Sequence, residues 1–593
     1  MHDGGPFALF DDEDGATLLL TGYRRSWQIM AGDDPAPVFH AIESAAAGGG
    51  WVALAADYAL GASFEAAVPP APPGRPLLRA WLFTDGQRLD ARATDAFLRQ
   101  CLDVIPECQR VAGIAELTVS VDAEDHAGQV RQVCRWIADG DCYQINLTFP
   151  LSFRLYGHPL ALYAAVRRRQ PVRYGGYLQT DESWILSFSP ELFFSRSGSR
   201  VRMRPIKGTA ARGQTAADDE EQRLTLLSSA KERAENVMIV DLLRNDLGRL
   251  AQPGRVSVEA LCEAEAYPTL WQMVSTVSAD LPGVSLCELF RALFPCGSIT
   301  GAPKIRAMQR IAVLEGSPRG LYTGALGWLA AGGECRFNVA IRTLEIAQGQ
   351  WGHLGVGSGI VADSNAEREY AECLLKASFL TGFDPGFKLV ETLRLEGGRY
   401  PLLPLHLDRL QNSARDLGFA CPLAVVSAAL AKEADQRPAG VYRVRLTLAH
   451  DGQYVVSSSP LADDSKGPWR VVLADERLPD ADYLRRHKTT ARAGYDRALA
   501  RLAACPGVFD VLFLNQAGEV CEGARSSVFV EREGVLLTPP LASGVLPGVL
   551  RRTLLDSGQA VERVLRRDDL ERQGAKLYVG NAVRGLLPVI LEL

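Results

Sequence analysis

The sequence of 593 residues lacks several features that would fix a protein class at once. It has no apolar run of the roughly 18 residues that a membrane-spanning helix needs, so no membrane association is expected. Its N-terminus has no basic segment followed by an apolar one, and we therefore expect no signal peptide. The formal net charge of -6 argues against a general nucleic-acid binder.

Metal-binding and disulfide patterns are also missing. The 12 cysteines form no CxxC pair and no regular spacing, which favours reduced thiols in a cytoplasmic protein. The 8 histidines form no zinc-like cluster, so any metal is expected to be a hard cation held by carboxylates. No Gly-x-Cys-x-Gly string provides the nucleophile of a glutamine amidotransferase. Ammonia for an amination would therefore come from a separate subunit or from free ammonium.

The composition is that of an ordinary globular protein, with 47% hydrophobic and 23% charged residues. We expect two catalytic parts: residues 1–380, with a core at about 110–376, and residues 387–593. The polar, Gly- and Pro-containing stretch 381–386 is expected to link them. Both parts show mixed helix and strand patterns, which predict α+β folds with predominantly antiparallel sheets.

Local patterns predict several elements. The expected helices and strands are helices at Ala216–Leu247 and Leu405–Leu417, and strands at Ser183–Phe188, Phe337–Leu344, Tyr442–Leu448 and Val511–Leu514. Gly248 is expected to cap the first helix at its C-terminus. A further helix is expected after Ser364, where Glu367 would complete a capping box.

Three glutamates suggest a cation site. Glu235 shares a helical face with apolar residues, and burying its carboxylate requires a partner. That partner is either a nearby arginine or a metal. Glu369 and Glu372 lie three apart on one helical face, where like charges repel unless a cation lies between them. A solvated helix face explains the pair alone, whereas the three carboxylates together suggest Mg2+.

A lysine in a turn is a candidate nucleophile, and two glycine-rich strings are candidate anion-binding turns. Lys207 lies in Pro205-Ile206-Lys207-Gly208-Thr209 and is either a nucleophile or a solvated surface residue. The strings Cys296–Lys304 and Gly355–Gly359 would let backbone N–H groups approach a carboxylate or phosphate. Arg342, placed on an expected strand among apolar neighbours, suits a carboxylate ligand.

These features form an ordered set of motifs: Tyr143–Leu147, Ser189–Glu191, Pro205–Thr209, Asp241–Gly248, Gly297–Lys304 and Gly359–Ser364. Together they resemble the chorismate-utilising enzymes over roughly residues 110–376. The resemblance implies that Glu235 and Glu372 ligate Mg2+, with Glu369 close by. It implies the substrate-binding residues Gln144, Thr300, Tyr322, Arg342, Gly357, Ser358 and Gly359.

Within this family, two positions point to amination. Lys207 stands where aminodeoxychorismate synthase component I typically has lysine and anthranilate synthases usually have alanine. Gln144 stands where water-adding relatives place a lysine base, and glutamine cannot act as a base. The resemblance implies that Lys207 attacks C2 of chorismate while Glu191, as general acid, helps the 4-hydroxyl leave. Gln272 replaces a histidine that many family members have, which weakens an anthranilate interpretation.

The C-terminal part resembles the fold-type IV enzymes that use pyridoxal 5'-phosphate (PLP), including aminodeoxychorismate lyase and branched-chain and D-amino-acid aminotransferases. The matching strings are Phe387–Arg394, Leu405–Leu410, His487–Thr490, Glu522–Phe529, Gly544–Gly548 and Gly580–Ala582. The resemblance implies that Lys488 binds PLP covalently, that Glu522 faces the pyridine nitrogen, and that Arg409 binds the phosphate. Val545, Leu546 and Asn581 are implied to assist at the phosphate.

The expected overall activity is synthesis of 4-aminobenzoate from chorismate and ammonia, with Mg2+ and PLP as cofactors. Two rivals remain open: an anthranilate synthase fused to an aminotransferase, and a regulatory protein with decayed sites. The retained lysines and glutamates argue against decay. A homodimer through the C-terminal part is left open by the resemblance, as is channelling of the intermediate.

Overall fold

The computed structural model describes residues 5–267, 270–461, 469–479, 482–502, 505, 507–572, 574 and 576–592. Residues 1–4, at the end where no signal peptide is expected, lie outside this set. By its contacts the chain forms two compact units. The first is made of Met1–Val104, Leu117–Leu155 and Pro159–Thr381, and the second of Ile105–Glu116, Tyr156–His158 and Gly382–Leu593. Two short segments that precede residue 160 thus belong to the second unit.

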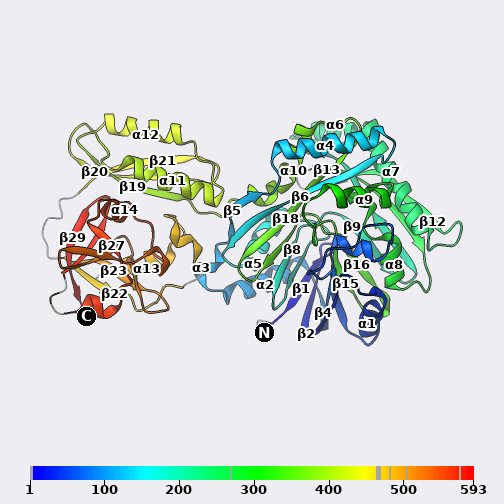
Figure 1. Cartoon of the computed structure of the whole chain (residues 1–593), viewed down its shortest axis with the longest axis horizontal. Coiled ribbons are helices and arrows are strands. Elements are labelled where there is room, and N and C mark those ends of the chain that lie inside the picture. The colour runs from blue at the N-terminus through cyan, green and yellow to red at the C-terminus, as the bar shows by residue number, and fades with distance from the viewer. Residues whose placement is uncertain are drawn as a thin grey trace. The chain divides into compact units, whose positions relative to one another are not determined.

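The first unit is built on one large antiparallel sheet (Figure 1). Its strands pair in the order β14 (Gly301–Ala302), β6 (Gln144–Tyr156), β18 (Trp351–Ile360), β17 (Thr343–Ala347), β8 (Ser183–Ser187), β7 (Gly176–Gln179), β1 (Phe7–Asp11), β2 (Thr17–Ile29), β4 (Leu78–Leu89), β3 (Trp51–Ala56), β15 (Ala325–Leu329), β16 (Cys335–Val339), β9 (Leu192–Ser197), β10 (Arg200–Arg204) and β13 (Leu270–Asp280). β13 also pairs with β11 (Ile206–Ala211) and β12 (Val256–Ala266).

The middle of this sheet is buried on both faces. In β3, Val52 and Leu54 belong to one hydrophobic cluster, while Ala53 and Ala55 belong to another. This alternation follows from the two-residue period of a strand, which points successive side chains to opposite faces. Continuous apolar runs such as Trp51–Ala56 therefore mark strands covered on both sides.

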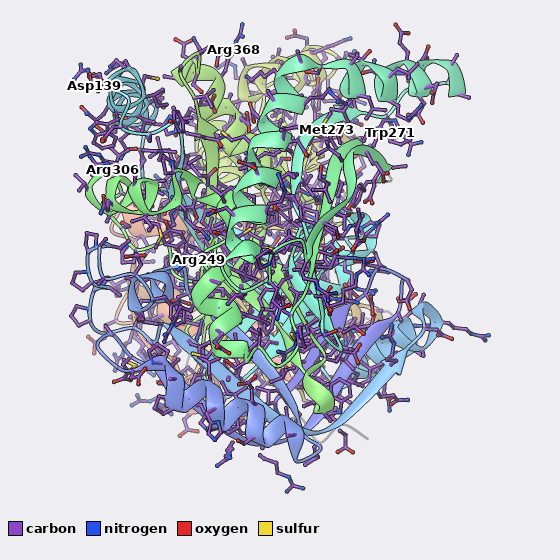
Figure 2. All side chains as sticks on the ribbon, turned by 90° about the vertical axis from the view of Figure 1, so that its right-hand side faces the viewer. Asp139, Arg249, Trp271, Met273, Arg306 and Arg368 are labelled. Carbon is purple, nitrogen blue, oxygen red and sulfur yellow. The ribbon has the colours of Figure 1, made fainter. Side chains whose placement is uncertain are left out.

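Helices pack around the sheet and carry part of the site. They include α4 (Ala123–Ala138), α5 (Pro159–Arg169), α6 (Ala216–Ser228), α7 (Ala230–Gly248), α8 (Leu286–Leu293), α9 (Lys304–Leu314) and α10 (Ala366–Thr381). α10 packs against α4 and β18. α7 packs against β11, β12 and β13. Figure 2 shows α7 running past the labelled Trp271 and Met273 of β13 down to Arg249.

The predicted helix over residues 216–247 is two helices. Ser229 interrupts it with an extended backbone, and its side chain accepts a hydrogen bond from Glu232 N as the N-cap of α7. Serine favours this role because its hydroxyl satisfies an otherwise unpaired helix N–H. Gly248 is the last helical residue rather than a left-handed cap, and Arg249 caps the helix.

Two further predictions on local structure are wrong. The expected strand Phe337–Leu344 is broken between β16 and β17, and Arg342 lies in the break with φ of 50°. The helix α10 does begin after Ser364, but Asn365 caps it by accepting from Arg368 N. The Ser364 hydroxyl instead donates to Glu369 at 2.7 Å, so the capping box with Glu367 is not formed.

The second unit has two sheets. β19 (Leu389–Glu396), β20 (Val441–Leu448) and β21 (Tyr454–Pro460) form an antiparallel sheet beside α11 (Leu403–Leu417) and α12 (Leu423–Asp435). The larger sheet has the order β24 (Val520–Gly523), β23 (Val508–Leu514), β22 (Trp469–Leu473), β29 (Gly585–Glu592), β28 (Lys576–Asn581), β25 (Ser527–Arg532), β26 (Val535–Thr538) and β27 (Ala560–Glu562). It is mixed, since β22 runs parallel to β23 and β29.

The predicted α+β class is confirmed for both parts, as are the predicted strands β8, β20 and β23 and the helix α11. Among the described residues, no helix is both long enough and apolar enough to cross a membrane.

Candidate active sites

Lys207 lies at an irregularity of strand pairing in the first unit. Ile206 pairs with Val274 and Thr209 pairs with Gln272, so β11 has one more residue than β13 over this stretch. Such a bulge re-aims a side chain that a regular strand would place on one of its two faces. Gly208 has φ of 91°, and a Cβ there would approach Glu232 Oε2 to 2.9 Å. The positive φ therefore favours glycine beside the lysine.

Glu191 is buried next to this lysine. It lies just before β9, and the Ser298 hydroxyl donates to its Oε1 at 2.6 Å. Burial raises the pKa of Glu191 to about 7, against the opposing effects of the Ser298 hydrogen bond and the Lys207 charge. The carboxyl is thus poised to give up or take up a proton near neutral pH.

Lys207 is surrounded by carboxylates from separate elements. Burial lowers the pKa of Lys207, while the charges of Glu191, Glu235 and Glu372 act in the opposite direction. Glu235 comes from α7 and Glu372 from α10. A lysine in such a position can lose its proton more readily than a surface lysine and become a nucleophile.

The charges of Glu235 and Glu372 act on Lys207, and that of Glu372 also acts on Glu235. Burial raises the pKa of Glu235, and the charges of Glu232 and Glu372 raise it further. Glu372 forms an ion pair with Lys376 at 2.8 Å. No group of three or more His, Cys, Asp or Glu within the described chain could hold a metal alone. Two carboxylates with an anionic substrate and waters fit the way Mg2+ is usually bound.

Glu369 lies three residues before Glu372 on α10, and its place near Mg2+ stays a prediction. Its carboxylate accepts from Ser364, and its charge acts on His126 and Cys134 of α4. Burial raises the pKa of Cys373, and the charges of Glu372 and Glu369 raise it further.

The remaining substrate-binding candidates line two adjacent strands. Gln144 begins β6, and its Nε2 is buried without a hydrogen-bond partner among the described residues. Gly359 of β18 lies beside it, because a Cβ at Gly359 would stand 2.6 Å from that Nε2. Gly357 and Ser358 precede it on the same strand, opposite Thr148 and Leu147 of β6. A buried amide without a partner suits a polar ligand.

Two neighbouring segments complete this region. The carbonyl of Thr300 accepts from Asn146 N at 3.0 Å, which fixes the glycine turn next to Gln144. The ring of Tyr322 packs on Gly355, where a Cβ would come within 2.1 Å of the ring. Burial raises the pKa of Tyr322 above its usual range, so this phenol stays protonated.

Arg342 has the character of an anion-binding residue. Its positive φ is rare for a side chain of this size. Burial lowers the pKa of Arg342, and no carboxylate among the described residues forms an ion pair with it. A buried guanidinium without a counterion is costly, and a bound carboxylate would remove the cost.

In the second unit, Lys488 is the centre of a polar group. Burial, assisted by the charge of Arg409, lowers the pKa of Lys488 to about 8, while Glu391 and Glu522 oppose this. Its carbonyl accepts from Val390 N at 2.8 Å, which ties it to β19. A buried amine that loses its proton near neutral pH can form a covalent bond with an aldehyde such as PLP.

Arg409 of α11 is held by Glu391. Its Nε and Nη2 donate to the two carboxylate oxygens at 2.8 and 2.6 Å, and Nη1 donates to Pro547 O at 3.2 Å. Burial alone would raise the pKa of Glu391, but Arg409 and His406 outweigh it and bring it to about 2. Arg409 therefore reaches the Gly544–Gly548 loop as a fixed cation.

Glu522 is placed by two donors. Its Oε1 accepts from Tyr495 Oη at 2.7 Å and its Oε2 from Leu546 N at 2.9 Å. Burial raises the pKa of Glu522. The Leu546 N–H that the sequence assigns to a phosphate is thus bonded to Glu522, while Val545 beside it is buried.

Asn581 lies at the end of β28, and its expected place near the phosphate stays a prediction. Its Oδ1 accepts from Val583 N and Arg584 N at 3.1 Å, and its Nδ2 donates to Arg525 O. These bonds form the turn between β28 and β29. Asparagine commonly stabilises turns in this way, and its side chain is committed to the turn.

Sequence reasoning missed three residues that organise these sites: Ser298, Glu391 and Tyr495. Ser298 and Glu391 lie inside the matching strings Gly297–Lys304 and Phe387–Arg394, so their position was a usable signal. Tyr495 lies in α13 (Ala493–Leu502) with no pattern that marks it.

Comparison with known proteins identifies both parts. Residues 40–382 match the model of the chorismate binding enzyme family, and residues 388–591 match amino-transferase class IV. The first match covers more than half of the chain, and the protein therefore belongs to the chorismate binding enzymes. Its C-terminal part has the class IV aminotransferase fold, which implies PLP.

The first part is similar to two kinds of curated enzyme. Aminodeoxychorismate synthase component 1 of Bacillus subtilis is 41% identical over 249 residues, 42% of this chain and 53% of the relative. Anthranilate synthase component 1 of Thermus thermophilus is 41% identical over 273 residues, 46% of this chain and 59% of the relative. The chain thus spans little more than half the length of these relatives. A crystal structure of anthranilate synthase component I from Streptococcus pneumoniae matches with a TM-score of 0.50 at 26% identity, covering 63% of this chain and 89% of that chain.

Proposed function

We propose that this chain makes 4-aminobenzoate from chorismate and ammonia in two steps at two sites. The observation that carries the proposal is Lys207, an amine with a lowered pKa beside the buried acid Glu191. The names of curated relatives do not choose between aminodeoxychorismate and anthranilate synthesis, since both kinds are equally identical to the chain. Lys207 favours aminodeoxychorismate synthesis over anthranilate synthesis.

The first step replaces the 4-hydroxyl of chorismate by an amino group. Neutral Lys207 Nζ forms a bond to C2, both ring double bonds shift by one position, and the C4–O bond breaks. Glu191 protonates the departing oxygen, which leaves as water. Ammonia then forms a bond to C4 and the C2–N bond to Lys207 breaks, so the net change is exchange of hydroxyl for amine. The covalent lysine adduct divides one difficult substitution into two easier ones.

The residues around Lys207 hold the substrate for this step. Arg342 would pair with one carboxylate of chorismate, and Gln144 Nε2 would donate to an oxygen near Gly359. Mg2+ held by Glu235 and Glu372 would neutralise the ring carboxylate. Burial raises the pKa of Glu235, and a bound cation would favour its ionised form.

The second step removes pyruvate from 4-amino-4-deoxychorismate. Lys488 takes the proton from C4, the C3–O bond breaks, and the ring becomes aromatic. PLP would supply an electron sink for the negative charge left at C4. Glu522 fits the pyridinium nitrogen, because a carboxylate fixed by Tyr495 and Leu546 favours a protonated ring nitrogen. Arg409 fits the phosphate as a fixed cation.

Ammonia is proposed to come from a separate glutamine amidotransferase. The "component 1" in the names of the relatives supports a second component. Free ammonium should replace that component in the test tube, and this makes the chain testable alone. A homodimer through the second unit is part of the same proposal and is decided by its mass in solution.

The test is incubation of the chain with chorismate, Mg2+, ammonium and PLP, with products identified by mass spectrometry. We expect 4-aminobenzoate and pyruvate. Lys488→Ala should accumulate aminodeoxychorismate, and Lys207→Ala should stop at chorismate. Lys231→Ala, on the neighbouring helix α7, is the matched control for the first site.

Other products would change the assignment. Anthranilate from the unaltered chain would replace the first step by the anthranilate reaction. Aminodeoxychorismate as the end product would leave the synthase intact and make the second unit an aminotransferase. Absence of turnover at both sites would favour a protein that keeps the fold but has lost activity.

A further inference from the structure

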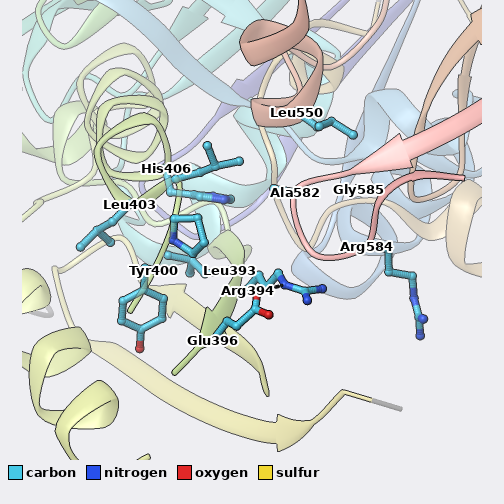
Figure 3. Close-up of a pocket in the computed structure, with 12 residues that line it drawn as sticks. Leu393, Arg394, Glu396, Tyr400, Leu403, His406, Leu550, Ala582, Arg584 and Gly585 are labelled. Atoms are coloured by element: carbon cyan, nitrogen blue, oxygen red, sulfur yellow. Dashed lines mark hydrogen bonds and ion pairs between the residues drawn. The ribbon is translucent and has the colours of Figure 1, made fainter. Parts of the chain in front are cut away.

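The second unit has a cavity of about 470 Å³ that does not belong to the Lys488 site. It lies between the end of β19, the start of α11, α14 (Val549–Asp556) and the turn that precedes β29 (Figure 3). The described residues that line it include neither Lys488 nor Glu522. Its volume is within the range of small-molecule sites.

A buried histidine faces this cavity with an unused nitrogen. His406 is 3% exposed, and its Nδ1 lies 2.6 Å from Glu391 Oε2. Its Nε2 is buried and has no hydrogen-bond partner among the described residues. In Figure 3 the imidazole points from α11 into the space below Leu550. Buried nitrogens are normally paired, so this one indicates a missing partner.

The state of Glu391 fixes which hydrogen bond His406 can offer. Glu391 is bonded to Arg409 through both oxygens and is therefore a carboxylate, which only accepts. The His406 Nδ1 must then carry the proton that it shares with Glu391. In a neutral imidazole this leaves Nε2 as an acceptor, so the cavity offers it to an N–H or O–H donor.

Two guanidinium groups also line the cavity. Arg394 donates from Nε to Glu396 at 2.9 Å and from Nη1 to Val583 O at 3.1 Å, which holds its side chain in place. Its Nη2 has no hydrogen bond to any described residue. Arg584 comes from the turn before β29. The Nη2 of Arg394 is thus the charged donor that the cavity can offer to an anion.

The remaining walls are apolar. Leu403, Leu550 and the ring of Tyr400 are among the residues that line it. Such walls favour a flat, largely apolar body over a sugar or a phosphate ester. The three features together define a ligand with an apolar ring, an anionic group and a hydrogen-bond donor.

We propose that this cavity is a second binding site for a cyclic monocarboxylate, whose carboxylate pairs with Arg394 and whose N–H or O–H donor pairs with His406 Nε2. The molecule of this class at hand is 4-aminobenzoate, the product of the proposed function. Only that identity rests on the proposed function, because the site chemistry does not depend on which reaction the enzyme carries out. The bound product would contact His406. His406 is hydrogen-bonded to Glu391, and Glu391 is bonded to Arg409.

The test measures binding to the PLP-loaded full chain by isothermal titration, with 4-aminobenzoate, benzoate and 4-aminobenzamide as probes. Benzoate lacks the donor and 4-aminobenzamide lacks the charge. We expect 4-aminobenzoate to bind about fivefold more tightly than benzoate and about tenfold more tightly than the amide. His406→Asn keeps an N–H for Glu391 but removes Nε2. It should weaken 4-aminobenzoate about fivefold and leave benzoate unchanged.

Further variants locate the site. Leu550→Trp fills the cavity and should abolish binding of all three probes, while Val455→Trp on exposed β21 is the control. Lys488→Ala should leave binding unchanged. Binding that is lost with Lys488→Ala and kept with Leu550→Trp would assign the ligand to the lysine site and overturn the proposal. Equal affinities of the probes would overturn it as well, even if Leu550→Trp failed to fold. Lack of 4-aminobenzoate synthesis would refute the proposed function without affecting these affinities.

Discussion

The Ser298 hydroxyl lies 2.6 Å from Oε1 of Glu191, and both residues are buried. This hydrogen bond favours the ionised form of Glu191, while burial favours its neutral form. The balance leaves the pKa of Glu191 at about 7. The acid strength of the proposed proton donor is thus set by a residue that does not touch the reacting bond.

Ser298→Ala should raise the pKa of Glu191 by about one unit, since a hydrogen bond to a charged group is worth about 1.5–3 kcal/mol. The alkaline limb of the pH–rate profile for chorismate consumption should move up by the same amount. Steady-state rates across the pH range measure this. Ser152→Ala, an exposed hydroxyl on β6, should leave the profile in place. An unmoved limb would show that another group sets it.

Lys488→Met should stabilise the second unit in the absence of PLP. The pKa of Lys488 is about 8 when folded and 10.5 when exposed, so the unfolded chain binds the proton more tightly. Protonation therefore opposes folding at neutral pH, and this cost disappears as the pH rises from 8 to 10.5.

Urea unfolding should show a gain of about 1–3 kcal/mol at neutral pH for this variant, and little difference above pH 10.5. Lys388→Met changes an exposed lysine just before β19, whose carbonyl accepts from Thr490 N, and should show no such pH dependence. A gain that persists at alkaline pH would reflect packing rather than charge.

Glu391→Gln should weaken the second unit and its cofactor site together. It leaves Arg409 as a buried cation without its counterion, and such losses cost about 3–5 kcal/mol. The low pKa of Glu391 places this contribution above pH 4.5, and it is lost as the pH falls toward 2. Denaturation and PLP titration measure the two effects. Glu433→Gln removes a helix pair with Arg437 and should cost less than about 1 kcal/mol.

Gly359→Ala should destabilise the first unit by about 1–3 kcal/mol, because the new methyl group stands 2.6 Å from Gln144 Nε2. In a Gln144→Ala background the cost should fall below about 1 kcal/mol, since the obstructing atom is gone. Thermal unfolding of the four proteins in this cycle tests the contact. Gly349→Ala, which meets no atom within 4 Å, is the control.

The sequence predicted the parts of the fold that depend on local patterns. Apolar patterns predicted β8 and β20. The ordered motifs predicted that Lys207, Glu191 and Glu235 belong to one site, and the charges of both glutamates do act on Lys207. The break at Ser229 was missed because helix periodicity continues across it, although serine is a good cap. The positive φ of Arg342 was missed because it depends on the neighbouring strands and not on the residue type.

Side-chain partners between distant segments were the hardest to predict. Spacing put Glu369 and Glu372 on one helix, but only the packing of α10 on α4 shows that the charge of Glu369 acts on His126 and Cys134. The Glu391–Arg409 pair joins residues 18 positions apart through the packing of α11 on β19. Such pairs follow from tertiary structure, which single-sequence patterns do not encode.

The extra residue in β11 puts selection for stability and selection for activity in opposition. Deletion of Lys207 would let Ile206 and Thr209 continue a regular ladder with β13 and would regain the pairing that the bulge interrupts. That deletion would also remove the amine on which the chemistry is proposed to depend. A library screened only for heat resistance should therefore accumulate straightened, inactive strands at this point, whereas a screen for growth without added 4-aminobenzoate should retain the irregularity.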